Sequence, residues 1–158
     1  MKIPDNLLAQ FQSFVEMYPF KRSALIPILL IVQEDFGYVP EELIQPIAQY
    51  LDVPEIDVHE VITFYSMLRT RPVGKHHIQV CTNISCMLLG GEEIYKFISK
   101  RLGISEGELT QDGRFSLTEV ECLGACCNAP AMQINYKYYE DLTIEKANKI
   151  LNDLENLP

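Results

Sequence analysis

The chain has 158 residues, a formal net charge of −9 and a hydrophobic fraction of 47%. Acidic residues outnumber basic ones on both sides of Thr70, which argues against the Lys- and Arg-rich surfaces that bind nucleic acid or anionic membranes. The hydrophobic fraction is sufficient for a packed core, so we expect a soluble globular protein.

Targeting and membrane-spanning segments are not expected. The longest apolar run, residues 24–32, is too short to cross a bilayer and contains Pro27. The first residues lack the apolar stretch of a secretory signal and the Arg-rich character of a transit peptide. The sequence therefore predicts a cytoplasmic protein without a membrane span of its own.

The first 70 residues show the apolar periodicity of consecutive helices, and we expect a small antiparallel helical bundle. The expected first helix, residues 6–17, has Asp5 as its cap, and the second, capped by Ser23, runs to Phe36 and ends at Gly37. Pro40 and Pro54 mark the starts of two more helices. Apolar residues mark one face of each of these two: Leu43, Ile47 and Leu51 on the third, and Ile56, Val58, Val61, Ile62 and Tyr65 on the fourth.

Pro72 and Gly74 interrupt the pattern between Arg69 and His77, which predicts a linker between a helical domain, residues 1–70, and a second domain, residues 71–158. The uneven spacing of Phe115, Leu117 and Val120 indicates a strand with a bulge. The expected order is strand, helix, three strands and helix, so the fold class is α+β. The other expected elements are strands His77–Cys81, Ala131–Asn135 and Tyr136–Glu140, and helices Gly91–Leu102 and Thr143–Leu154.

The five cysteines all lie at or after residue 81, and their odd number argues against a disulfide framework. Cys81 and Cys86 follow the first expected strand with four residues between them, and Cys122 and Cys126 follow the second with three between them. If the two strands are neighbours, both loops emerge at the same end of the sheet. Four thiolates could then converge on a metal centre.

A 2Fe-2S cluster with four thiolates has a net charge of −2 and needs hydrogen-bond donors around it. Glycine and alanine in the two loops allow backbone N–H groups to approach the sulfurs, and apolar residues would limit water; Glu121 is expected to point outward. The expected donors lie at Gly90, Gly91, Gly124 and Ala125, and the expected apolar shell comprises Met87, Leu88, Leu89, Leu123 and Pro130.

Other interpretations of these residues remain open. The cysteine spacing is tolerable for a structural zinc site, whereas the Cys-x-x-Cys motif of a thiol oxidoreductase is absent. His59-Glu60 lacks the second histidine of a metalloprotease motif because Thr63 occupies that position, and His76 and His77 are not needed as ligands. The aromatic run Tyr136, Tyr138 and Tyr139 is interpreted as half-buried strand packing, with a partner surface as the alternative.

The segments Cys81-Thr-Asn-Ile-Ser-Cys86 and Val-Glu-Cys122-Leu-Gly-Ala-Cys126-Cys-Asn-Ala-Pro130 resemble the thioredoxin-like 2Fe-2S ferredoxin family. Within that family, the chain is similar to the small iron–sulfur subunits of the NADH-oxidising module of respiratory complex I, NADH-quinone oxidoreductase. The similarity includes residues 21–27, 33–40 and 63–65. It implies a helical N-terminal domain followed by a thioredoxin-like domain with a small mixed sheet.

The resemblance also implies a function and a ligand set. Cys81, Cys86, Cys122 and Cys126 fall on the family's four ligand positions for one 2Fe-2S cluster, and Cys127 has no ligand counterpart. The expected role is to transfer electrons from the flavin of a partner subunit that binds FMN and NADH, within a complex peripheral to the cytoplasmic side of the inner membrane. This chain has no nucleotide-binding motif. Related modules of NAD-linked hydrogenases and formate dehydrogenases are the alternatives.

Overall fold

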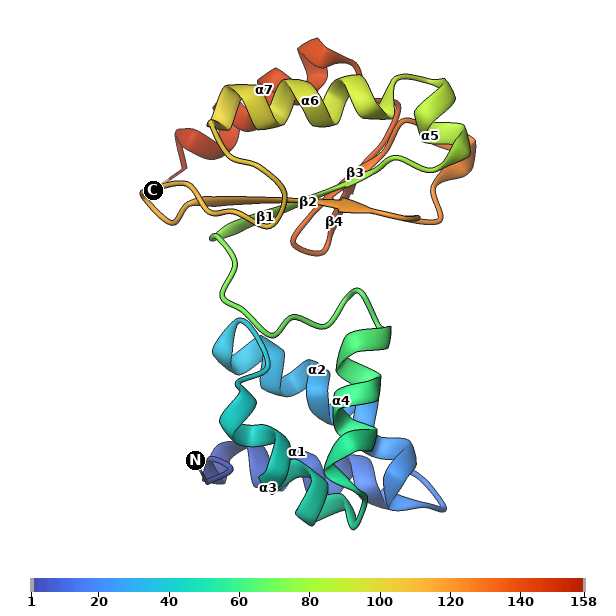
Figure 1. The fold of residues 1–158 in the computed structure, drawn as a ribbon, viewed down its shortest axis with the longest axis vertical. Helices are drawn as coiled ribbons and strands as arrows, with labels where there is room; N and C mark the ends of the chain where they lie inside the picture. The colour runs from blue at the N-terminus through green and yellow to red at the C-terminus, as the bar shows by residue number, and fades with distance from the viewer. Residues whose placement is uncertain (1, 158) are drawn as a thin grey trace. The chain divides into compact units, whose positions relative to one another are not determined.

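The structure is a computed structural model that describes residues 2–157. The chain divides into two compact units, of which the first ends at Pro72 and the second begins at Val73 (Figure 1). None of the described helices is long and apolar enough to cross a membrane.

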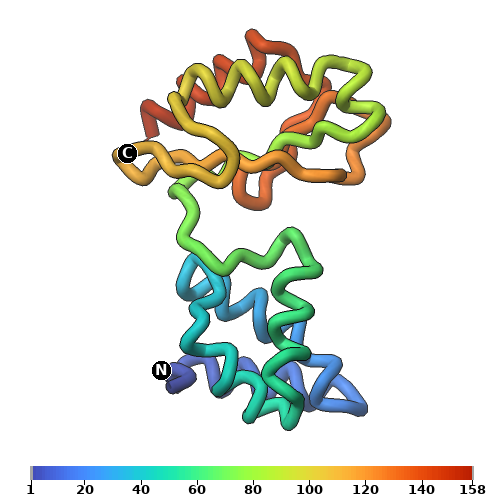
Figure 2. The backbone as a smooth tube through the Cα atoms, viewed as in Figure 1, coloured from blue at the N-terminus to red at the C-terminus, as the bar shows by residue number. Residues whose placement is uncertain are grey.

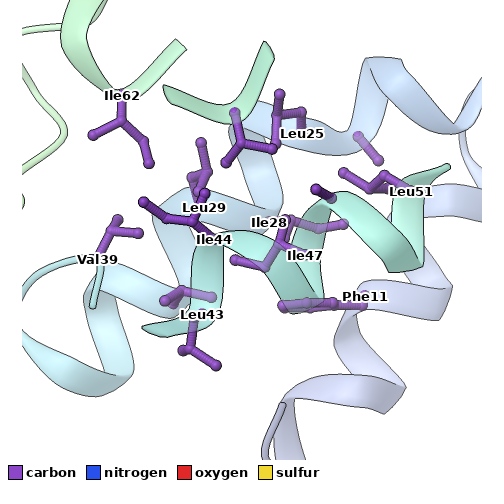
Figure 3. Packing of buried hydrophobic residues seen from close by; sticks show 14 of the residues in the cluster. Phe11, Leu25, Ile28, Leu29, Val39, Leu43, Ile44, Ile47, Leu51 and Ile62 are labelled. Carbon is purple, nitrogen blue, oxygen red and sulfur yellow. The ribbon is translucent and has the colours of Figure 1, made fainter. Parts of the chain in front are cut away.

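The first unit is entirely helical. Its elements are α1 (Asp5–Glu16), the 3-10 helix η1 (Lys21–Ala24), α2 (Leu25–Phe36), α3 (Glu41–Leu51) and α4 (Glu55–Phe64). Apolar side chains from all four α-helices form one core, in which Phe11 of α1, Ile28 of α2 and Ile47 of α3 are fully buried (Figure 3). Burial of this core is the main force that holds these short helices together, because isolated helices of this length are marginal in water.

The helix boundaries in the first unit confirm some sequence expectations and correct others. Pro40 and Pro54 precede α3 and α4, and Gly37 ends α2 in the left-handed conformation with a φ of 81°. Asp5 is the first residue of α1 rather than its cap, and Ser23 lies inside η1, so neither side chain caps a helix. Ile56 is exposed, because α4 directs Val58 and Ile62 into the core instead.

The end of the first unit is attached to α2 through one buried side chain. The Gln33 side-chain amide donates to the carbonyl of Met67 across 2.9 Å and accepts from the backbone N–H of Arg69 across 2.7 Å. The Val39 N–H in turn donates to the carbonyl of Arg69. These bonds satisfy the backbone of the segment after α4 where no helix continues.

The second unit is a four-stranded mixed sheet in the order β2-β1-β3-β4, with α6 and α7 on the same face (Figure 1). A core of apolar residues from the strands and both helices includes Ile78, Ile98, Leu117 and Leu151. The α+β class is thereby confirmed. The elements are β1 (His76–Cys81), α5 (Ile84–Leu88), α6 (Gly91–Leu102), β2 (Phe115–Val120), the 3-10 helix η2 (Cys126–Asn128), β3 (Met132–Ile134), β4 (Lys137–Tyr139) and α7 (Ile144–Glu155).

Strand β1 lies between a parallel and an antiparallel neighbour. It pairs with β2 in parallel, residue by residue from His76 opposite Phe115 to Cys81 opposite Val120, and with β3 in antiparallel orientation. The expected bulge in β2 is therefore absent, and the shift in apolar spacing reflects the exposure of Glu119 near the end of the strand. The short helix α5 is an element that sequence periodicity did not indicate.

Candidate metal centre

The parallel pairing of β1 and β2 brings both cysteine-containing loops to one end of the sheet. Cys81 is the last residue of β1 and lies opposite Val120, two residues before Cys122. Figure 2 shows the yellow-green segment after β1 and the orange segment after β2 at the same end of the sheet. The condition for the two loops to emerge together, that their strands are neighbours, is therefore met.

The first cysteine pair is buried. Cys81 and Cys86 are 3% and 2% exposed, and they pack with Val120 and Ala131 in a small cluster separate from the main core. The backbone N–H of Cys81 donates to the carbonyl of Ala131, which ties β1 to the segment before β3. This pair therefore lies in a dry, well-supported part of the unit.

Cys86 is positioned by α5, which begins at an effective cap. The side-chain oxygen of Asn83 accepts from the N–H of Ile84 across 2.7 Å, and the carbonyl of Asn83 accepts from Met87 N–H. Asparagine is among the best N-terminal caps, so this residue fixes the start of the helix that contains the second cysteine. Helix α5 was not predicted from the sequence, although an asparagine followed by apolar residues, as at Asn83, is one sign of a helix start.

The environment of Cys86 favours the protonated thiol when no metal is bound. Burial raises the pKa of Cys86 from 9.0 to about 11, a backbone hydrogen bond from Ala131 opposes this shift, and the neighbouring Cys81 reinforces it. The charge of Cys126 also raises this pKa, so Cys126 of the second pair lies within electrostatic range of Cys86. A cation at this position would relieve the penalty by binding the thiolate.

The second cysteine pair is exposed. Cys122 and Cys126 both face solvent, and the backbone N–H of Gly124 donates to the Sγ of Cys122 across 3.2 Å. Gly124 has a φ of +73°, a conformation that glycine adopts without strain. The expectation that small residues allow N–H groups to approach the sulfurs is confirmed at Gly124.

Cys127 directly follows the expected ligand Cys126 in the chain. In an extended loop the side chains of adjacent residues would point in opposite directions, but residues 126–128 form the 3-10 helix η2. Alternation therefore does not separate Cys126 from Cys127, and both are exposed. Gly91 lies against the backbone carbonyls of Cys81 and Cys86.

Four cysteines on two adjacent loops are a donor set that could hold a 2Fe-2S cluster. Among residues 2–157, no three histidine, cysteine or acidic side chains are grouped closely enough to hold one ion. A tetrahedral zinc site needs its ligands around one point, whereas a 2Fe-2S cluster spreads four thiolates over two irons. Two cysteine pairs on adjacent loops match the latter requirement.

The rim of the site is apolar and uncharged on the side of α5. Ile84 and Leu88 are 68% and 74% exposed, and Met87 and Leu89 are also exposed. Met87, Leu88 and Leu89, which were expected to limit water around the sulfurs, are thus exposed themselves. No charged residue occurs in segments 82–91 or 122–136, and Glu121 is exposed as expected.

On the inner side of the site, Leu123 packs against the buried cysteines and Pro130 is buried. Thr82, which follows the first cysteine, donates its hydroxyl hydrogen bond to the carboxylate of Glu119 on β2. Sequence analysis did not identify this contact, because it joins residues 37 positions apart.

The histidines lie away from the cysteines. His76 and His77 are buried at the opposite end of β1, where the Nδ1 of His77 lies 2.8 Å from the Ser116 hydroxyl. His59 belongs to α4 of the first unit, and its backbone carbonyl accepts from the Thr63 hydroxyl.

The tyrosines at β4 and directly before it are more exposed than the sequence predicted. Tyr136 and Tyr138 are exposed, and only Tyr139 packs against the core. Half-buried strand packing was therefore the wrong interpretation for two of the three tyrosines.

The second unit combines a four-stranded mixed sheet, two helices on one face and two cysteine pairs at one end. The sequence profile of the thioredoxin-like [2Fe-2S] ferredoxin family matches residues 11–155, and the chain belongs to this family. The family resemblance noted in the sequence is thus confirmed.

Individual relatives show which type of protein within this family the chain is similar to. The E-type subunit of NADH-quinone oxidoreductase from Rickettsia bellii (strain RML369-C) is 46% identical over 152 residues, which cover 94% of this chain and 91% of that protein. A second E-type subunit of the same enzyme, from Rhizobium meliloti (strain 1021), is 40% identical over 142 residues, with 90% and 84% covered. The chain is therefore a homologue of the E-type subunits of NADH-quinone oxidoreductase.

A solved structure supports the fold alone. An NAD+-reducing [NiFe]-hydrogenase in the H2-reduced state superimposes with a TM-score of 0.69 at 17% identity, over 82% of this chain and 22% of that chain.

Proposed function

We propose that this chain is the subunit of an NADH-quinone oxidoreductase that holds one 2Fe-2S cluster on Cys81, Cys86, Cys122 and Cys126. The cluster receives electrons from the flavin of a partner subunit that binds FMN and NADH. Similarity to the E-type subunits over nearly the whole length of both chains supports the assignment to this complex. The single observation that supports the cluster most strongly is the parallel pairing that places both cysteine pairs at one end of the sheet.

The residues of the chain supply ligands, donors and exclusion of water. The cluster, when bound, accepts and releases one electron at a time. Buried Cys81 and Cys86 would hold the cluster from the protein interior, and exposed Cys122 and Cys126 would hold it from the side that faces solvent. Backbone N–H groups of Ala131 and Gly124 donate to sulfurs of Cys86 and Cys122, and such donors stabilise a reduced cluster. No residue needs to act as an acid, base or nucleophile.

The uncharged rim around the site is suited to contact with another protein. Ile84, Met87, Leu88 and Leu89 expose apolar surface next to the buried Cys86, and exposed apolar patches commonly mark protein interfaces. Docking of the flavin-containing subunit over this rim would exclude water from the cluster and shorten the path for the electron. The complex would place this chain on the cytoplasmic side of the inner membrane, as a peripheral component.

Analysis of the purified protein tests the cofactor. We expect about two iron atoms and about two acid-labile sulfides per chain, a reddish-brown colour that bleaches with dithionite, and a paramagnetic signal after reduction. One zinc ion without sulfide would identify a structural zinc module instead. A metal-free chain with a titratable dithiol would indicate a thiol oxidoreductase.

Purification of the complex from its native cells tests the partner. A tagged chain should co-purify with a flavoprotein that oxidises NADH, and the preparation should reduce quinone. Recovery with a hydrogenase or formate dehydrogenase subunit would assign the chain to the corresponding module of another NAD-linked enzyme. The hydrogenase superposition does not favour that alternative, because similarity at 17% identity reports fold alone.

A further inference from the structure

Gly91 is the first residue of α6, and it touches the main chain of both buried cysteines. A Cβ atom built on Gly91 would lie 2.7 Å from the carbonyl oxygen of Cys81 and 2.9 Å from that of Cys86. Real Cβ atoms essentially never come within 3.0 Å of such atoms. Both contacts are with backbone, so no side-chain rotation could relieve them.

Space, and not backbone conformation, is what requires glycine at this position. Gly90 has a φ of +96°, which favours glycine by itself, whereas Gly91 does not have a positive φ and could adopt the same backbone with any side chain. The close approach to Cys81 and Cys86 is therefore the feature that explains glycine at the start of α6.

Neither side of this contact is free to move. Cys81 is held in β1 by its hydrogen bond to Ala131 and by pairing with β2, and Cys86 is held in α5. On the other side, α6 packs onto the sheet through the buried side chains of Ile94 and Ile98. A methyl group at residue 91 would have to push the start of α6 away from the cysteines or change their separation.

We propose that Gly91 is a positioning residue for the cluster. Its missing side chain allows the first turn of α6 to fix the main chain of Cys81 and Cys86 together, and this fixes the separation at which the two thiolates bind. The inference rests on the proposed function, since it assigns Gly91 a role toward the proposed cluster.

The full chain provides a matched control at the other end of β1. Gly74 also lacks a positive φ, and a Cβ there would lie 2.5 Å from the carbonyl carbon of Phe115, a backbone atom that is not near any cysteine. Gly91→Ala and Gly74→Ala therefore introduce the same group against backbone in the same unit. Both variants should unfold at a lower temperature in the cluster-free form.

The two variants should differ in the cluster itself. We expect Gly91→Ala to lose iron to a chelator about tenfold faster than the parent, the lower end of the range for changes around metal ligands, and to show a shifted paramagnetic spectrum after reduction, because displacement of the Cys81 and Cys86 main chain would change the separation of the two thiolates. Gly74→Ala should keep the parent spectrum and the parent rate of iron loss. Equal behaviour of the two variants, or a parent-like Gly91→Ala, would overturn the positioning role.

A milder pair of variants covers the case in which Gly91→Ala does not fold. Ile94→Val and Ile98→Val each remove one methylene from the buried face of α6, one close to Gly91 and the other a turn further along. Ile94→Val should lose iron faster than Ile98→Val, and equal rates would contradict the inference. A parent chain that contains no iron and no sulfide would refute the proposed function instead, so the two failures are distinguishable.

Discussion

The backbone N–H of Gly124 points at the Sγ of Cys122 and donates to it across 3.2 Å. In the buried pair, a backbone hydrogen bond from Ala131 lowers the pKa of Cys86 and partly opposes the effect of burial. One cysteine of each proposed ligand pair thus receives a hydrogen bond from a backbone N–H. Substitution of a side chain does not remove a backbone N–H. Its direction depends on the backbone conformation instead.

Gly124→Ala should therefore lower the reduction potential of the cluster. A side chain at a φ of +73° costs about 1–2 kcal/mol, and relaxation of that strain would turn the N–H away from Cys122. A redox titration followed by electron paramagnetic resonance measures the potential. Gly107→Ala is the control, because Gly107 has a φ of +72° and also has open space around its missing Cβ. Its N–H donates to the Leu117 carbonyl and not to sulfur, so an equal shift in both variants would refute the explanation.

Serine substitutions separate the two adjacent cysteines of η2. Cys126→Ser should lose or distort the visible absorption of the cluster, whereas Cys127→Ser should retain it, because Cys126 falls on a ligand position of the family and Cys127 does not. Absorption spectra and iron content of the two purified variants provide the measurement. The reverse result would exchange the roles of the two residues.

Much of the second unit could be predicted because its elements have local markers. The helix at residues 91–102 was predicted with the observed bounds, since Gly103 ends an amphipathic run in the left-handed conformation with a φ of 67°. The meeting of the two cysteine loops was expected on the condition that their strands are neighbours, and the pairing of β1 with β2 meets that condition. The ligand assignment itself came from the family resemblance and stays a prediction.

The features that sequence did not reveal depend on tertiary contacts or on very short elements. α5 has five residues, too few for helical periodicity, and it turns Leu88 and Leu89 outward. The role of Gly91 depends on the approach of α6 to the β1 loop, which no local pattern encodes. The resemblance assigns a ligand position to Cys126 and none to Cys127, and the 3-10 helix η2 provides no alternation of side chains that would separate the two residues.

Gln33→Leu should destabilise the helical unit. The leucine would fill the buried position but leave the carbonyl of Met67 and the N–H of Arg69 without their present partner, at a cost of about 2–4 kcal/mol. Urea denaturation followed by far-ultraviolet circular dichroism measures the change. Gln49→Leu, at an exposed position of α3, is the control and should change the free energy of unfolding by less than about 0.5 kcal/mol. A similar loss in both variants would show that the Gln33 hydrogen bonds are unimportant.

Acid should destabilise the chain partly through His76. Burial, together with the positive charges of Lys75 and Arg114, lowers the pKa of His76 below its ordinary value of 6.5. Its Nε2 is also buried without a hydrogen-bond partner among the described residues. The unfolded chain therefore binds a proton at this site more readily than the folded chain. The contribution of neutral His76 to stability is present above pH 6.5 and is lost as the pH falls from there toward the folded-state pKa.

His76→Phe removes this titration and can keep the ring contact with Phe115, whose centroid lies 5.3 Å from that of His76. The difference in free energy of unfolding between His76→Phe and the parent should increase in favour of the variant as the pH is lowered from about 7.5 to about 5.5, because only the parent must protonate this site on unfolding. Urea denaturation of the two cluster-free chains at several pH values measures the difference, and carboxylates common to both chains cancel in it. A difference that stays constant with pH would mean that His76 has the same proton affinity in the folded and unfolded chains, which would contradict the effect of its burial.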